Sequence, residues 1–449
     1  MSAKQEIHSG AEAHKKVLAR YGAVDNPSLQ AYVTRVGKAL AAASDRPELD
    51  WHFTVVDSPE VNAFAQPDGY VYVTRGILAY LNSEAELAGI LGHEIGEVAA
   101  HHAMGQQRAS AGTRLETILG ASMALGVNNE AGAAMPQNPA ESWTAGYGRD
   151  DELEADRLGA EYLAKAGYNP QAMLKVISVL RDLESFDAKN VRYGVSEPNH
   201  YHVTFSRCPD NDARLKQVVD EAATNRVASP RHDDGDLLRV MNGVYFGDGP
   251  EQGVVRNSAL LRERLGFAIQ FPQGWKVQNQ RDRVIATSLQ QDAMMQLASG
   301  PKNSGTPLET LQKGLKLDPG ARFESGSVNG FPSGFAAGSK AGKPLLAAAI
   351  DFDGKRYLVA GITQDGPAYQ RNRDGIKSAI SSFHAITASE RQQARPFVIR
   401  IIHAQYAMTM AGLAAHSPLG PNAESYLRLM NDLYPDGEPR PGQLLKVVD

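Results

Sequence analysis

The sequence predicts an α+β protein built from three domains, and three observations lead to this fold class. The chain has 449 residues, too many for a single hydrophobic core. Helical and strand-like periodicities both occur in its first half. After a polar connector, strand-like patterns dominate, and the last fifty or so residues read as strand, helix, helix and strand.

The front domain is expected over residues 1–225 and combines helices with a small sheet. Ser83 and Glu86 form a capping-box pattern, which marks the start of its central helix. The last turn of a later helix is followed by Gly167, a common helix-ending residue. The expected elements are helices over 11–21 and 27–43, a strand over 51–56, a hairpin of 61–65 and 70–74, and helices over 84–104, 150–166 and 170–183.

The second half divides at two polar stretches. Residues 226–257 are charged and predict a connector, and 388–396 predicts a linker. Between them, 258–388 is expected to be a small α+β domain, with strands in 266–277, 345–352 and 356–362 and a helix over 369–382. The tail, 396–449, is expected to contain a strand over 397–402, helices over 408–415 and 423–433, and a strand over 444–448.

Composition narrows the classes of function. A net charge of −5, a pI near 6.2 and the lack of a basic block argue against a nucleic-acid partner. The single cysteine, Cys208, cannot form an internal disulfide. No apolar run is long enough for a transmembrane segment. The first residues are polar and predict no signal peptide, so we expect either a cytosolic protein or a mature exported chain with an added start methionine.

The stretch His93-Glu94-Ile95-Gly96-Glu97 carries the most information about function. It is the zinc-peptidase signature His-Glu-x-x-His with its last histidine replaced by glutamate. Positions i and i+4 share one face of a helix, so the intact motif lets two imidazoles bind one Zn²⁺. The glutamate that follows the first histidine, here Glu94, acts as general base toward water.

A second helix supplies two more carboxylates. Glu152 and Asp156 are four residues apart, so they lie on one helical face. Glu152 suits the role of third protein ligand, and Asp156 suits that of a carboxylate that orients a ligating imidazole. The alternative is a solvated acidic face without a ligand.

Together these motifs resemble the gluzincin metallopeptidases, and in pattern the BepA-like and HtpX-like proteins of the bacterial envelope. The resemblance covers about residues 5–220. It implies a zincin-like fold, one Zn²⁺ held by His93, Glu97 and Glu152, with Glu94 as base and Asp156 behind the ligands. It also implies that substrate pairs as a strand with the edge strand Asn62, Ala63, Phe64 and Ala65.

Two departures from the family bear on activity. The family has histidine at position 97, and His101 and His102 lie too far along a straight helix to replace it. Glu97 can ligate zinc through oxygen, but the added negative charge makes the metal a weaker Lewis acid and favours harder ions. The family also has a histidine that can close the metal site where this chain has Cys208. Cys208 is therefore a candidate fourth ligand or switch, with His200 and His202 as rivals, and the alternative is a small buried or loop cysteine without function.

The strand, helix, helix and strand order of the tail loosely resembles a LysM module. This resemblance implies a contact with peptidoglycan, and a purely structural role is the alternative. Where LysM modules have Gly-Asp-Thr at the entry to the first helix, this chain has Ala407-Met408-Thr409.

Three hypotheses for function follow. The first is a zinc-dependent metalloendopeptidase of the periplasm or cell envelope that acts on unfolded or misassembled proteins, with activity weakened by Glu97. The second is a silenced metallopeptidase-fold scaffold or chaperone-like adaptor. The third is a binding protein whose main activity resides in 258–449. A cytoplasmic location is the alternative to the envelope.

Overall fold

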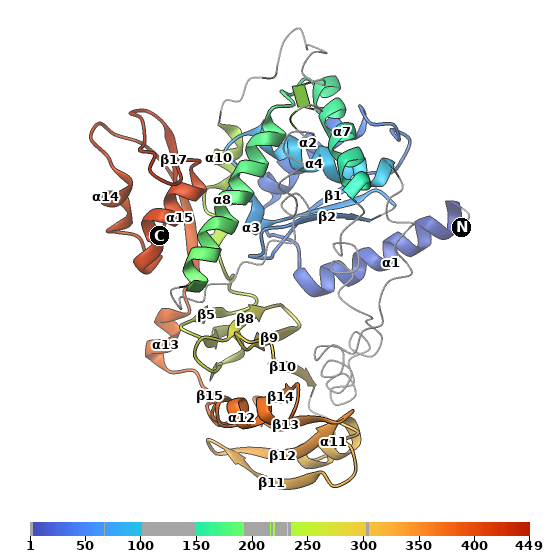
Figure 1. Cartoon of the computed structure of the whole chain (residues 1–449), viewed down its shortest axis with the longest axis vertical. Coiled ribbons are helices and arrows are strands. Elements are labelled where there is room, and N and C mark those ends of the chain that lie inside the picture. The colour runs from blue at the N-terminus through green and yellow to red at the C-terminus, as the bar shows by residue number, and fades with distance from the viewer. Residues whose placement is uncertain are drawn as a thin grey trace.

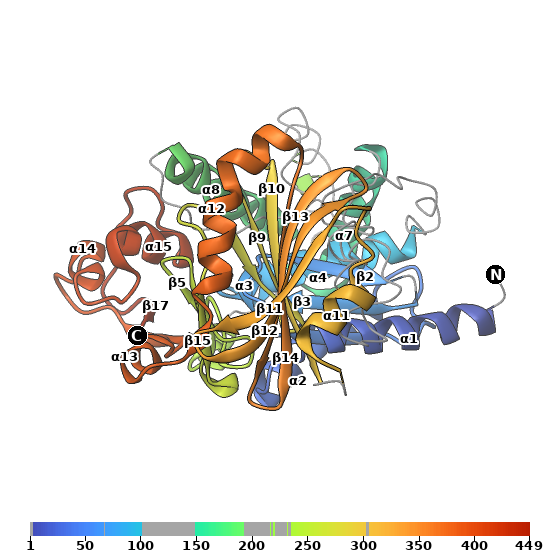
Figure 2. The ribbon, with the colours of Figure 1, turned by 90° about the horizontal axis from the view of Figure 1, so that it is seen from below.

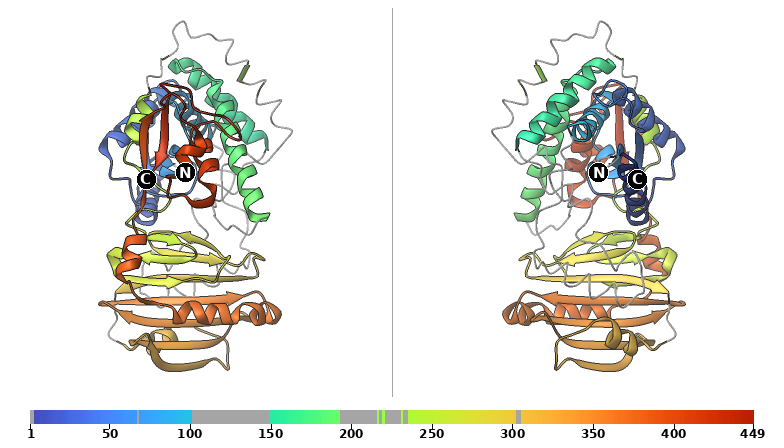
Figure 3. Two further views of the ribbon diagram at one scale, coloured as in Figure 1. Left: turned by 90° about the vertical axis from the view of Figure 1, so that its left-hand side faces the viewer. Right: turned by 90° about the vertical axis from the view of Figure 1, so that its right-hand side faces the viewer.

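The fold is taken from a computed structural model of the chain (Figure 1). The residues that it describes are 3–66, 68–100, 149–192, 216, 219, 220, 231, 235–301 and 305–449. The front half and the tail lie side by side, and the sheets formed by residues 254–385 stack beneath them (Figure 3). Within the described residues, no helix is both long and apolar enough to cross a membrane.

The front half is built on a three-stranded sheet covered on both faces. Its order is β1-β3-β2, with β1 parallel and β2 antiparallel to the central β3. Val17 and Tyr21 of α1 pack on one face, where they meet Phe64 and Tyr72. The other face packs against α2 and α4. The bounds are α1 Ala3–Tyr21, α2 Pro27–Ala41, β1 His52–Val56, β2 Ala63–Gln66, β3 Tyr70–Thr74, α3 Arg75–Leu78, α4 Glu84–Ala99, α7 Arg149–Ala166 and α8 Ala172–Arg192.

Residues 254–385 form two antiparallel sheets. The seven-stranded sheet has the order β11-β12-β13-β14-β10-β9-β8, and the four-stranded sheet has the order β15-β7-β6-β5. Figure 2 shows α12 and α11 on opposite sides of the larger sheet, which matches the two separate apolar clusters to which they contribute. The bounds are β5 Val254–Arg256, β6 Ala259–Arg262, η3 Glu263–Leu265, β7 Phe267–Gln270, β8 Lys276–Asn279, β9 Arg283–Thr287, β10 Ala293–Pro301, α11 Pro307–Gly314, β11 Arg322–Val328, β12 Phe331–Lys340, β13 Lys343–Phe352, β14 Lys355–Thr363, α12 Gly366–Ser381 and β15 His384–Ala385.

The tail has the predicted order of strand, helix, helix and strand, while its likeness to a LysM module stays a prediction. Its two strands pair with each other antiparallel, and the first also pairs with β4, from the segment predicted as a connector. That segment therefore differs from the prediction, because its described residues contain a helix and two strands. The bounds are α10 Asp236–Met241, β4 Tyr245–Phe246, α13 Ala388–Gln393, β16 Phe397–His403, α14 Met410–Ala414, η4 Gly420–Asn422, α15 Ala423–Met430 and β17 Leu444–Val448.

The tail and the front half share one hydrophobic core. Leu427 and Tyr426 of α15 belong to the same buried cluster as Leu87 of α4. The ring of Tyr426 meets that of Phe186 in α8 edge to face, with centroids 4.8 Å apart. The buried Lys446 of β17 donates a hydrogen bond from Nζ to the backbone oxygen of Leu81, two residues before the cap of α4. The tail therefore packs against the front half and contributes side chains to its core.

This shared core predicts that a cavity in the tail destabilises the front half as well. Leu427→Ala removes a fully buried side chain and is expected to cost about 2–5 kcal/mol of unfolding free energy. Leu289→Ala is the matched control, because Leu289 is 67% exposed and its truncation is expected to cost within about 0.5 kcal/mol. Scanning calorimetry should show that Leu427→Ala lowers the temperature at which the front half unfolds. An unchanged unfolding temperature of the front half in this variant would contradict the shared core.

Candidate metal centre

The signature motif lies on helix α4, which is buried in the front half. Its N-cap is Ser83, whose side chain accepts a hydrogen bond from the Glu86 N–H at 3.1 Å. The predicted capping box is only half formed, because Glu86 accepts from the Asn82 N–H instead of from the cap residue. Every residue from Glu86 to Val98 is buried. Burial on all sides fixes the helix in position, as a metal site requires.

Three glycines let α7 approach α4 closely. A Cβ on Gly96 would lie 2.6 Å from the backbone oxygen of Ala155, and one on Gly159 would lie 3.0 Å from the backbone nitrogen of His93. On Gly92 it would lie 2.6 Å from a methyl carbon of Leu163. Any larger residue would push the two helices apart. Sequence reasoning missed this contact, although glycines four residues apart at 92 and 96 are the signal that could have found it.

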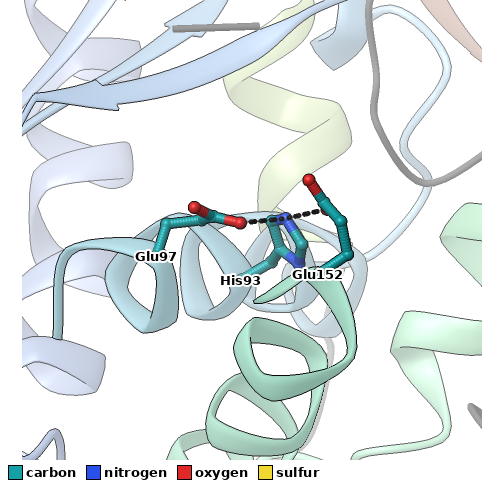
Figure 4. Close-up of side chains that lie close together, drawn as sticks. All are labelled: His93, Glu97 and Glu152. Carbon is teal, nitrogen blue, oxygen red and sulfur yellow. Dashed lines mark ion pairs between the residues drawn. The ribbon is translucent and has the colours of Figure 1, made fainter. Parts of the chain in front are cut away.

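The close approach brings the predicted ligands together. His93, Glu97 and Glu152 each offer a ligand atom, and these atoms all lie within 4.8 Å of one another. The His93 Nε2 atom is 3.8 Å from Glu97 Oε1 and 3.6 Å from Glu152 Oε2. Figure 4 shows the two carboxylates on either side of the imidazole, one from its own helix and one from the first turns of α7. All three residues are buried.

Asp156 orients the imidazole of His93 through the ring nitrogen Nδ1. Its Oδ1 atom lies 2.9 Å from His93 Nδ1, and both side chains are buried. With Nδ1 donating to this carboxylate, Nε2 is the ring nitrogen that faces Glu97 and Glu152. A ligating histidine is held in this way in many metal sites, where the second nitrogen donates to a carboxylate.

Glu94 follows His93 on α4 and is 7% exposed. Burial raises the pKa of its carboxyl to about 7; the charge of His93 opposes this shift and that of Glu97 adds to it. A carboxyl with a pKa near neutrality can accept a proton and release it again at physiological pH. Glu94 therefore has the acid–base behaviour expected of the residue at this position of the motif.

Without a metal ion, protons neutralise the site. Burial disfavours the imidazolium of His93, but its hydrogen bond to Asp156 and the charges of Asp156, Glu152 and Glu97 outweigh burial and raise its pKa to about 10. Burial also raises the pKa of Glu152 to about 8, against the opposing charge of His93. Four carboxylates around one imidazole thus attract positive charge.

The donor set fits a divalent metal such as zinc. Both carboxylate oxygens of Glu152 are buried and have no hydrogen-bond partner among the described residues. Imidazole nitrogen and carboxylate oxygen are both zinc ligands in proteins. His93, Glu97 and Glu152 would hold the ion, and Asp156 would fix the imidazole.

The other predicted site residues are the substrate strand and the candidate switch, and only the first of these lies in the described part of the chain. Asn62, Ala63, Phe64 and Ala65 lie at or in β2, the edge strand of the front sheet, which packs against α4. The candidate switch Cys208 lies outside the described residues. So do its rivals His200 and His202, and the two histidines at 101 and 102.

Comparisons with known proteins point to one peptidase family. The sequence profile of peptidase family M48 matches residues 27–222. This segment, which makes up less than half of the chain, is similar to that family. The matched segment includes α4, α7 and β2, and with them the three candidate metal ligands His93, Glu97 and Glu152.

Several relatives of this chain carry names of proteases. The beta-barrel assembly-enhancing protease of Yersinia pestis is 26% identical over 340 residues, which are 70% of this chain and 67% of that protein. Its namesake from Escherichia coli strain K12 is 27% identical over 49% of this chain and 45% of that protein. The mitochondrial metalloendopeptidase OMA1 of Arabidopsis thaliana is 32% identical over 36% of this chain and 32% of that protein. The chain thus spans less than half the length of the last two.

The family match and the names of these relatives support a metalloendopeptidase hydrolase. The mixed α and β fold of the described residues and their His-Glu-Glu cluster accord with a metal-dependent peptidase. The LysM-like module predicted for the tail lies beyond the matched residues, so the family match leaves it as a prediction.

Proposed function

We propose that this chain is a zinc-dependent endopeptidase in which His93, Glu97 and Glu152 hold the metal. The observation that carries the proposal is the convergence of these three side chains from two helices at one buried point, with Glu94 beside them and Asp156 behind. Zinc bound there would polarise a peptide carbonyl and make water a stronger acid.

The residues of the chain supply the rest of the chemistry. Glu94 takes the proton of the attacking water and passes it to the leaving amine, for which its pKa of about 7 is suited. Asp156 keeps Nδ1 of His93 protonated, so that Nε2 stays available to the metal.

The edge strand β2 offers a place for the substrate backbone. Thr74 N–H donates to Asn62 O at 3.0 Å, and Gly69 N–H donates to Gln66 O at 3.1 Å. Because backbone groups alternate in direction along an antiparallel strand, those of Ala63 and Ala65 point away from β3, toward the edge at which no described strand pairs with β2. An extended peptide could pair with them by strand addition.

This pairing predicts the effect of a proline at the edge. Ala65→Pro removes one outward N–H while leaving the bonds to β3 in place, because proline is tolerated where an edge-strand N–H faces outward. We expect KM for an unfolded protein substrate to rise about 5- to 10-fold, the cost of roughly one hydrogen bond, with little change in kcat. Steady-state kinetics on casein would measure both. An unchanged KM would remove β2 from the substrate site.

The activity itself is tested by hydrolysis of casein or an unfolded protein. We expect cleavage by the purified chain, its loss on chelation and its return with added zinc. The second candidate function is a silenced scaffold, and Glu97 is the observation that favours it. Absence of both metal and hydrolysis in this chain, with both gained by Glu97→His, would establish the scaffold.

The substrate class and location extend the proposal. Relatives named beta-barrel assembly-enhancing protease support unfolded or misassembled proteins of the periplasm or cell envelope as substrates. The LysM-like order of the tail and the 90% exposed Tyr406 at its first loop support a contact with peptidoglycan. We expect the full chain to be retained on isolated peptidoglycan and Tyr406→Ala to reduce this retention. No retention of the unmodified chain would rule out the contact.

A further inference from the structure

We infer that Glu97 changes the metal preference of the site, so that Mn²⁺ competes with Zn²⁺ far better than it does at a two-imidazole centre. The inference rests on the proposed function, since it concerns the same three ligands. It goes beyond that function because it assigns a second metal and a physical role to the substitution in the motif.

The inference starts from the donor atoms. Among the described residues, the cluster has a single nitrogen donor, Nε2 of His93, and two carboxylates, from Glu97 and Glu152. The two carboxylates lie within 4 Å of that nitrogen on either side of it (Figure 4). With one imidazole and two carboxylates, the site supplies more oxygen than nitrogen to a bound ion.

A second observation supports a bound cation at this site. Glu152 is only 9% exposed, yet neither of its oxygens has a hydrogen-bond partner among the described residues. A buried carboxylate without hydrogen bonds is costly to a fold. A metal ion bound next to Nε2 of His93 would satisfy that carboxylate directly.

The chemistry of the donors then selects among metals. Carboxylate oxygen suits Mg²⁺, Ca²⁺ and Mn²⁺, whereas imidazole suits zinc and other transition metals. The retained imidazole disfavours Mg²⁺ and Ca²⁺, which take oxygen ligands. Mn²⁺ is the ion that accepts both donor types among these hard cations. Zinc keeps the higher absolute affinity, because affinities generally rise along the first transition row, so the effect lies in the ratio of the two affinities.

The test measures that ratio in the full chain and in Glu97→His. The protein is stripped with a chelator, then titrated with Mn²⁺ and with Zn²⁺ against a competing indicator at one pH, and Mn²⁺ binding is followed independently by electron paramagnetic resonance. Glu97→Gln keeps an oxygen donor but removes the charge, and it serves as second variant in case the histidine disturbs the fold. Glu154→Gln removes an exposed carboxylate two residues from Glu152 and is the matched control.

We expect the preference for zinc over Mn²⁺ to be about 10-fold or more smaller in the unmodified chain than in Glu97→His, the size of effect that changes around a metal ligand produce. Glu97→Gln should weaken Mn²⁺ binding, and Glu154→Gln should change neither affinity. An equal or larger zinc preference in the unmodified chain, or binding of neither metal, would overturn the inference. The expected ratio without peptide hydrolysis would instead count against the proposed function alone.

Discussion

Glu94→Gln should reduce peptide hydrolysis by about 10²- to 10⁴-fold, the usual contribution of a general base. The amide has nearly the same shape as the carboxyl but cannot accept the proton of the attacking water. Glu94 is buried beside His93 and carries a pKa of about 7, which suits it to accept a proton near neutral pH. The measurement is kcat on casein or an unfolded protein, at saturating metal.

The control separates chemistry from metal binding. Glu94 is not among the three ligands, so metal content and the thermal stability of the metal-loaded variant should stay close to those of the unmodified chain. Glu154→Gln changes the same functional group at an exposed position and should leave kcat unaltered. Full activity in Glu94→Gln would exclude the proposed mechanism.

The local elements around the site could be predicted because each depends on short-range rules. Ser83 marks the start of α4 by its side-chain hydrogen bond, and the spacing of Glu152 and Asp156 places both on one face of α7. These rules need no knowledge of the rest of the chain. The His-Glu-Glu cluster followed from them once the two helices were brought together.

The arrangement of distant segments could not be predicted in this way. The strands β9 to β12 were missed, because β11 is an exposed edge with no apolar alternation and β12 is rich in small residues. The tail was expected to be a unit of its own, yet Leu427 and Tyr426 complete the core of the front half. The periodicity of a helix shows that one of its faces is buried, but it does not show which distant segment packs on that face.

Metal affinity should rise steeply with pH between about 6 and 8. Folding without metal raises the pKa of Glu152 from 4.5 to about 8 and that of His93 from 6.5 to about 10. A metal ion must displace the protons that these raised pKa values hold in place. Release of one to two protons gives an affinity that increases about 10- to 100-fold per pH unit. Calorimetric titration with zinc at several pH values, in buffers of different ionisation enthalpy, would count the protons released.

The same shifts set the stability of the metal-free protein. Both groups bind protons more tightly when folded than when unfolded, so the folded state loses stability as pH rises through these pKa values. For Glu152 the loss runs from about 4.5 to about 8, and for His93 it runs from about 6.5 to about 10. Added metal should therefore raise the melting temperature more at pH 8 than at pH 6. In Glu152→Gln the carboxyl contribution disappears, so its metal-free stability should depend less on pH between 5 and 8. A melting temperature that responds equally to metal at both pH values would show that no proton is displaced, and that the cluster does not bind the ion through these groups.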